Sequence, residues 1–200
     1  MDEFVSLPSL PAPLRWHTLP TRWQATDSSL TMTAGARTDL FIDPRGATPM
    51  RNAPRLLGLV SGDFQLGARV AVDFAATFDA GVLLVWRDEE HWAKLCFEYS
   101  PRGRPMIVSV VTRGTSDDAN AFEVPTNHVW LRVSRIGAAF AFHASTDGQS
   151  WELIRHFRLE AGEAANLGFL AQSPTGAGCT VVFDEVRFAP EGVQDIRGGE

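Results

Sequence analysis

The chain lacks the features that identify several common classes of protein. Its 200 residues include two cysteines, Cys96 and Cys179, and neither belongs to a CxxC pair or a Cys/His cluster. A structural zinc site is therefore not expected. We expect two free thiols, while a disulfide between distant strands stays open because spacing alone does not decide it. Gly-rich phosphate loops are also absent, and we expect no metal and no cofactor.

Long apolar runs and clusters of basic residues are missing as well. No stretch reaches the roughly 18 consecutive apolar residues of a transmembrane helix. The N-terminal sequence MDEFVSLPSLPAPLRW starts acidic and has no apolar run of signal-peptide length. The net charge is −6, which argues against nucleic acid or an anionic membrane and leaves a neutral or cationic partner open. We therefore expect a cytoplasmic protein that binds neither nucleic acid nor membrane.

Helix signals are equally scarce. The one segment with some helical character, residues 159–168, is short and contains glycine. Many short apolar runs separated by Gly, Asp, Asn and Pro are typical of an all-β sandwich or barrel. The pattern predicts strands at 21–24, 29–33, 39–42, 56–60, 63–75, 80–86, 92–99, 105–112, 128–135, 138–144, 151–158, 166–172 and 179–188.

The composition suits a single domain with a substantial core, since 44% of the residues are hydrophobic and 21% are charged. Residues 6–14 are proline-rich and should be extended. Residues 191–200 are polar and glycine-rich and should fray. We therefore expect a proline-rich arm over 1–14, one β-sandwich domain over 15–190 and a flexible tail over 191–200.

The most informative stretch is GVLLVWRDEEHWAKLCFEYS, residues 81–100. Its two strand patterns are joined by the charged turn 87–91, which is short enough to make them antiparallel neighbours. If the turn closes symmetrically, Trp86 lies opposite Trp92 and Leu84 lies opposite Lys94. Because side chains alternate along a strand, Leu83, Val85, Ala93, Leu95, Phe97 and Tyr99 should fill the sandwich interior.

The opposite face of this hairpin carries Trp86, Trp92, Lys94 and Glu98. Burying the two charges without partners would cost several kcal/mol, so we expect this face to meet water or a ligand. Aromatic rings beside polar groups suit a sugar, which has an apolar face and hydroxyls to bond. A structural alternative stays open, because a cross-strand Trp pair contributes roughly 0.2–1 kcal/mol and a surface ion pair little.

Neighbouring strands offer four further polar residues for this site. Ser109 and Arg113 share one side of their strand, His143 alternates against Phe142, and Gln172 ends a strand with parity opposite to Phe169. The predicted ligand-binding set is therefore Trp86, Trp92, Lys94, Glu98, Ser109, Arg113, His143 and Gln172. If that set binds sugar, Trp92→Ala should weaken the affinity by about 1 kcal/mol or more without unfolding the domain.

Three segments of the chain resemble domain-of-unknown-function family 1349. They are the hairpin at 81–100, the segment VWLRVSRIGAAFAFHASTDGQSWELIRHF and the closing LGFLAQSPTGAGCTVVFDEVRF. The resemblance covers roughly residues 15–190. It implies a concanavalin A-like jelly-roll sandwich of two antiparallel sheets. Related sandwiches include carbohydrate-binding modules and the C-terminal domain of family 43 β-xylosidases, and the family includes proteins described as regulators of sugar metabolism. The resemblance thus implies a sugar-related function by analogy and supplies no catalytic residues.

The sequence leaves three alternatives to carbohydrate binding. A glycoside hydrolase needs two converging carboxylates, and the E-x-D-x-x-E run of laminarinase-type sandwiches is absent, so catalytic residues are not expected. The segment TSDDANAFE, residues 115–123, offers oxygens for calcium but is more simply an exposed polar loop. The Trp-rich face would also suit a protein partner or a homodimer, because Trp and Arg are common interface anchors.

Overall fold

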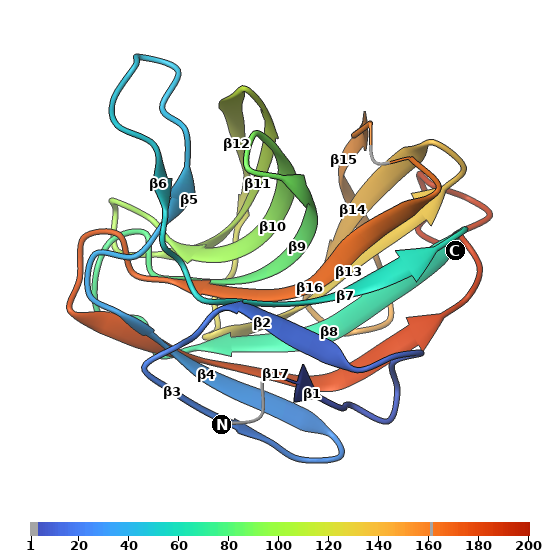
Figure 1. Ribbon diagram of the computed structural model, residues 1–200, viewed down its shortest axis with the longest axis horizontal. Coiled ribbons are helices and arrows are strands. Elements are labelled where there is room, and N and C mark those ends of the chain that lie inside the picture. The colour runs from blue at the N-terminus through green and yellow to red at the C-terminus, as the bar shows by residue number, and fades with distance from the viewer. Residues whose placement is uncertain (1–3, 161) are drawn as a thin grey trace.

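The computed structural model describes residues 4–160 and 162–200, which form a sandwich of two antiparallel sheets (Figure 1). These residues contain no helix, and so none that could cross a membrane. The predicted all-β fold, a concanavalin A-like jelly roll, is confirmed. Every predicted strand range overlaps an observed strand, because the alternation of apolar residues reports directly which side chains face the core.

Within the described residues the first sheet has eight strands and the second has seven. In spatial order the first comprises β1 (Phe4–Val5), β2 (Leu14–Thr18), β7 (Arg55–Ser61), β16 (Ala164–Gln172), β9 (Ala80–Asp88), β10 (His91–Tyr99), β11 (Pro105–Arg113) and β12 (Thr115–Glu123). The second comprises β15 (Glu152–Arg158), β14 (Ala139–Ser145), β13 (His128–Ile136), β8 (Phe64–Val72), β17 (Gly178–Ala189), β4 (Ser29–Gly35) and β3 (Arg22–Ala25). A small separate pair comprises β5 (Leu40–Phe41) and β6 (Met50–Arg51).

The main core lies between the two large sheets. Strand β8 shows strict alternation of buried and half-buried residues, which is the pattern of a strand with one face on a core. The sheets approach closely at Gly81, where an added Cβ would lie 2.6 Å from methyl groups of both Val181 and Val70. Glycine at this position therefore lets β9 pack against the second sheet without overlap.

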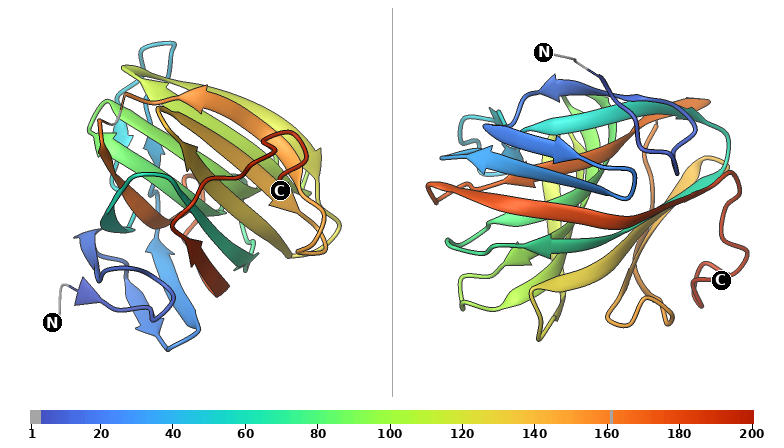
Figure 2. Two further views of the ribbon diagram at one scale, coloured as in Figure 1. Left: turned by 90° about the vertical axis from the view of Figure 1, so that its right-hand side faces the viewer. Right: turned by 90° about the horizontal axis from the view of Figure 1, so that it is seen from below.

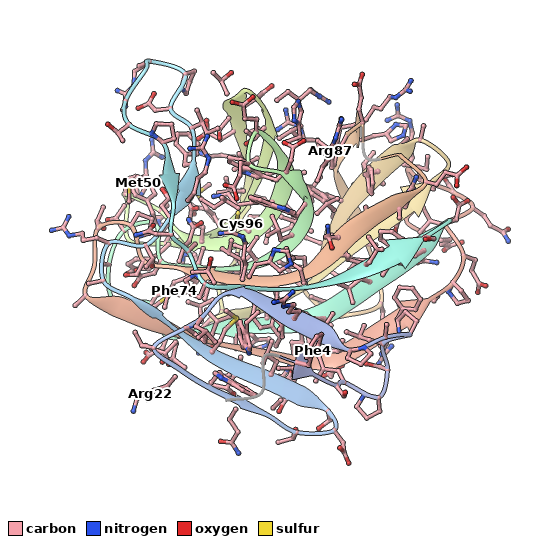
Figure 3. All side chains as sticks on the ribbon, in the orientation of Figure 1. Phe4, Arg22, Met50, Phe74, Arg87 and Cys96 are labelled. Atoms are coloured by element: carbon pink, nitrogen blue, oxygen red, sulfur yellow. The ribbon has the colours of Figure 1, made fainter. Side chains whose placement is uncertain are left out.

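A second hydrophobic cluster lies on the outer side of the first sheet, away from the main core. We call it the outer cluster. It is covered by what we call the covering hairpin, residues 39–53, which includes β5 and β6 and rises beside β9–β12 in Figure 1. Cys96 of β10, labelled in Figure 3, is one of its members. The buried members are Leu40, Ile42, Ala53, Leu57, Ala80, Val82, Leu84, Trp86, Trp92, Cys96, Val108, Val110 and Leu170.

The prediction of a loop at residues 115–123 is wrong, since this segment is strand β12 at the edge of the first sheet. Its side chains are mostly exposed, so the sequence has no apolar alternation that marks a strand. Instead, backbone pairing with β11 holds this segment in an extended strand conformation. Polar and charged residues are what an edge strand uses to avoid pairing with other chains.

The C-terminal segment, residues 191–200, contacts the outer side of the second sheet, as Figure 2 shows. His143 Nε2 donates a hydrogen bond to the carbonyl of Ile196 at 2.8 Å, and Arg132 donates one to the carbonyl of Gly199. Val193 is buried. These contacts place the tail on β13 and β14, while the flexibility of the tail and the domain boundaries stay predictions.

Candidate ligand-binding cavity

The hairpin of β9 and β10 has the predicted register. Trp92 pairs with Trp86, and Lys94 pairs with Leu84. The two indole rings stack with their centroids 5.5 Å apart and an interplanar angle of 11°. The inward-facing residues Leu83, Val85, Ala93, Leu95 and Phe97 belong to the main core as predicted, whereas Tyr99 at the end of β10 is only partly buried and is not part of it. Strand parity thus places the tryptophans and the charged residues together on the outer side of the first sheet.

The expectation that the tryptophans face solvent or ligand is wrong. Trp92 is 0% exposed and Trp86 is 5% exposed, because the covering hairpin packs over them. The guanidinium of Arg55 lies 4.5 Å from the centroid of the Trp86 ring. These rings are therefore part of the outer cluster, and Trp92→Ala is a change in the core rather than in a binding surface.

Further along the same face the cover ends and a cavity of about 410 Å³ opens. It lies between the covering hairpin, the outer face of β10–β12 and the two loops at 73–79 and 173–177. The end of β5 is tied to β12, since the amide of Ile42 donates to Ser116 Oγ at 3.0 Å. The lining residues are Asp39, Phe41, Asp43, Arg45, Phe78, Lys94, Glu98, Val108, Val110, Asp118, Gln172, Pro174 and Thr175.

Lys94 lies at the base of this cavity and is only 2% exposed. Its Nζ donates a hydrogen bond to Gln172 Oε1 at 3.0 Å and lies 3.6 Å from Asp39 Oδ1. It also lies 6.0 Å from the centroid of the Phe41 ring. Partners from two other elements therefore offset the cost of removing the ammonium group from water.

Glu98 faces the same cavity and is partly buried. Among the described residues its carboxylate has no hydrogen bond or ion pair. The pKa of Glu98 is raised to about 7, chiefly by burial; Lys94 opposes this shift, and the carboxylates of Asp39 and Asp118 add to it. The cavity therefore contains a carboxyl group that is available to a ligand and titrates near neutral pH.

Phe78 stands at the edge of the cavity in a strained conformation. Its φ is 71°, in the left-handed region that a bulky residue rarely adopts, and its side chain is 37% exposed. Its amide donates to the carbonyl of Tyr99 at 2.8 Å, and its carbonyl accepts from Gln172 Nε2 at 3.4 Å. Strain of this kind persists where surrounding contacts enforce it, and it is common at functional sites.

The contacts that enforce this conformation come from Asp79, the next residue. Its carboxylate accepts hydrogen bonds from the amides of Ala75 and Ala76 at 2.9 and 2.8 Å. The hydroxyl of Ser173 donates to the same carboxylate at 2.6 Å. Asp79 thereby holds the 73–79 loop and the 173–177 loop together beside the cavity.

Comparison with known families gives one match over most of the chain. The family described as "Protein of unknown function (DUF1349)" matches residues 16–191. The chain belongs to this family. The resemblance stated from the sequence is thereby confirmed. No curated protein matches the chain in sequence.

Solved structures share the fold of this family member. A functionally unknown protein from Saccharomyces cerevisiae has a TM-score of 0.82 at 24% identity, covering 88% of this chain and 95% of that chain. A mutant GH43 protein from Bacillus licheniformis has a TM-score of 0.71 at 15% identity, covering 88% of this chain but 36% of its own. The carbohydrate-binding module CBM66 from Bacillus subtilis has a TM-score of 0.55 at 14% identity, covering 86% and 94%. At these identities the likeness shows a shared β-sandwich fold.

The structure brings together three of the eight predicted site residues, Lys94, Glu98 and Gln172. Trp86 and Trp92 lie on the same face but under the covering hairpin. Gln172 has the predicted parity, and its place next to β9 puts it beside Lys94.

The other three predicted residues lie away from the cavity. Ser109 is buried on the inner side of its sheet, where Arg155 Nη1 lies 3.4 Å from its hydroxyl. Arg113 is exposed and donates to the carbonyl of Arg158. His143 is off the core face as predicted but belongs to the second sheet, so its partner is the tail. Parity alone says neither which face of β11 joins Lys94 nor which sheet β14 joins, so the sequence pattern does not separate these three residues from the site.

Sequence reasoning missed Phe41, Phe78 and Asp118. A signal for Asp118 existed, because β12 pairs Asp118 with Val110 and β10 pairs Lys94 with Val110. Recognising 115–123 as a strand would have placed Asp118 on the cavity side. Phe78 lies in a loop, where no periodicity indicates the direction of a side chain.

Proposed function

We propose that this protein binds a carbohydrate or glycoside without transforming it, and that the ligand occupies the cavity over Lys94, Glu98 and Gln172. The observation that carries the proposal is the cavity itself. Its volume of about 410 Å³ falls in the range typical of small-molecule sites. Its lining sets two phenylalanine rings among several polar and charged side chains, so it can contact both an apolar face and the hydroxyl groups of a ligand.

The chemistry of the lining suits a sugar ring. Phe41 and Phe78 offer apolar faces for the C–H side of a pyranose. Lys94 Nζ has donors beyond the one bonded to Gln172, and Glu98 accepts or donates according to its protonation. Directed hydrogen bonds of both kinds are what hydroxyl groups require.

The structural neighbours support the sugar class by analogy. They include a carbohydrate-binding module and GH43 proteins, although one fold hosts many functions. The proposal includes the cytoplasmic location predicted from the sequence. The two buried free thiols are consistent with that location, because disulfides are rare in the cytosol. A homodimer stays a prediction, and an interface on Trp86 and Trp92 is incompatible with their cover.

Titration calorimetry against a panel of monosaccharides, glycosides and short oligosaccharides tests the proposal. Phe78→Ala should weaken binding of the best ligand by about three- to tenfold, because it removes a stacking face. Phe4→Ala is the matched control, since Phe4 is 58% exposed and does not line the cavity. Absence of heat across the whole panel, or equal loss in both variants, would refute the proposal.

Glycoside hydrolysis is the second candidate, and the raised pKa of Glu98 is the observation that favours it. A general acid in a glycosidase has such a pKa and acts with a second carboxylate, and the other carboxylates that line the cavity are Asp39, Asp43 and Asp118. Incubation of the best ligand with the protein, followed by chromatography, distinguishes the two functions. Unchanged ligand supports binding, and cleavage that Glu98→Gln abolishes supports hydrolysis.

A further inference from the structure

The charges of the cavity do not balance. Arg45 forms an ion pair with Asp43 at 2.7 Å, and Lys94 lies 3.6 Å from Asp39. Each cation of the lining is therefore matched by one carboxylate. Glu98 and Asp118 remain, and among the described residues neither side chain has a hydrogen bond or an ion pair. The cavity thus has two carboxyl groups more than its own cations can neutralise.

We infer that the ligand carries a positively charged amine, as an amino sugar or an amine-substituted glycoside does, and that Glu98 binds this amine while Asp118 adds negative charge to the same cavity. The inference rests on the proposed carbohydrate function and narrows the ligand class. A neutral sugar would leave the partly buried Glu98 carboxylate without a counter-charge, and an acidic sugar would add repulsion from both Glu98 and Asp118. A protonated amine supplies the missing positive charge and donates a charge-assisted hydrogen bond to the Glu98 carboxylate.

An organic cation fits this cavity better than a metal ion. No group of three or more His, Cys, Asp or Glu side chains among the described residues is arranged to hold a metal. The remainder of the lining includes the rings of Phe41 and Phe78 and the side chains of Val108 and Val110. Aromatic faces attract an ammonium group, and apolar walls suit its carbon substituents.

The groups that face Glu98 determine how binding responds to pH. Lys94 comes from β10, Asp118 comes from β12, and Asp39, Asp43 and Arg45 come from the covering hairpin. Because burial raises the pKa of Glu98 to about 7, this carboxyl is largely protonated at pH 6 and largely ionised at pH 8. Affinity for a permanently charged amine should therefore increase over this interval.

Matched glycosides test the inference. The probes are 2-aminoethyl, 2-hydroxyethyl and carboxymethyl glycosides of xylose, glucose and galactose, with 2-aminoethanol as the sugar-free probe. The alkyl amine stays protonated between pH 6 and 8, so only the protein titrates. The aminoethyl form should bind about tenfold more tightly than the hydroxyethyl form at pH 8, as a charge-assisted hydrogen bond allows. This preference should be smaller at pH 6.

Single substitutions then show which carboxyl groups cause the preference for the aminoethyl glycoside. Glu98→Gln should reduce it to about twofold and remove its pH dependence, because a charge-assisted bond becomes a neutral one. Asp118→Asn, at an exposed position where folding is not at risk, should reduce it as well. Glu152→Gln, an exposed carboxylate on β15 in the other sheet, should change nothing.

The outcomes separate this inference from the proposed function. If hydroxyethyl or carboxymethyl glycosides bind as tightly as the aminoethyl form, the cation inference is wrong while carbohydrate binding stands. If 2-aminoethanol binds and depends on Glu98 but the sugar adds no affinity, the amine site stands and the carbohydrate function fails. If nothing binds, both are refuted.

Discussion

Trp92 and Glu98 lie on one strand and point to the same side of the first sheet, but their surroundings differ. Trp92 is 0% exposed beneath the covering hairpin, whereas Glu98 lines an open cavity. The outer face of β10 is therefore part of a packed core at its Trp92 end and part of the cavity lining at its Glu98 end. Alternation along a strand decides which face a side chain joins. What lies above that face is decided by a segment distant in sequence, here residues 39–53.

The comparison also separates stability from recognition. Under the cover the side chains are apolar and closely packed, so changes there should act on the free energy of unfolding. In the cavity many are polar, and changes there should act on binding with smaller effects on the free energy of unfolding. Three variants test this division.

The largest effect is expected for Trp92→Ala, which should lower the free energy of unfolding by about 3–5 kcal/mol. The substitution removes a fully buried ring that stacks on Trp86. Denaturant unfolding measures the loss. Trp92→Phe is the control, since it retains a ring and removes an indole N–H that has no partner among the described residues. A Trp92→Ala variant of wild-type stability would contradict the burial.

A smaller effect is expected for Glu98→Gln, and it should depend on pH. Burial raises the pKa of Glu98 from 4.5 to about 7, so between these values the folded state holds a proton that the unfolded state has lost. Wild-type stability should therefore fall as the pH rises through this window. Because Gln cannot ionise, the variant should be more stable at pH 8, by on the order of 1–2 kcal/mol after solvent screening, and equal below about pH 4. Unfolding curves at several pH values measure the difference. A constant difference would contradict the assigned pKa.

The smallest effect on stability is expected for Phe78→Gly. Glycine adopts a φ of 71° without strain, and the relief of about 1 kcal/mol should offset the loss of a partly exposed ring. Stability should stay within about 1 kcal/mol of wild type, while affinity for the best sugar falls as in Phe78→Ala. Paired unfolding and calorimetric titrations test both halves. A large loss of stability would show that the ring is structural.

The sequence predicted well what depends on periodicity. The all-β fold, the pairing of Trp86 with Trp92 and the outward direction of Lys94 and Gln172 all follow from alternation, and the structure confirms them. The rule that a buried charge needs a partner holds for Lys94, which has Gln172 and Asp39 beside it. The exposure inferred from that rule is wrong for this residue, since Lys94 is only 2% exposed.

The cover and the edges of the site were not predictable in the same way. The two strands of the covering hairpin are two residues long each, too short for a pattern. Strand β12 is held by backbone pairing while its side chains stay polar. His143 was grouped with the site because parity on one strand does not identify its sheet. These features depend on contacts between distant segments, and no local pattern encodes them.

The shortness of β5 and β6 has a consequence for how the chain folds. A hairpin with two-residue strands has little intrinsic stability, so it can dock only after β9, β10, β11 and β16 have assembled the surface that it covers. Until that late step the indoles of β9 and β10 are exposed to solvent, and an incompletely folded chain has an exposed aromatic patch that favours aggregation with other chains. Amide hydrogens of the hairpin should accordingly exchange earlier than those of the sheet beneath, so that opening of the molecule begins at the wall of its own cavity.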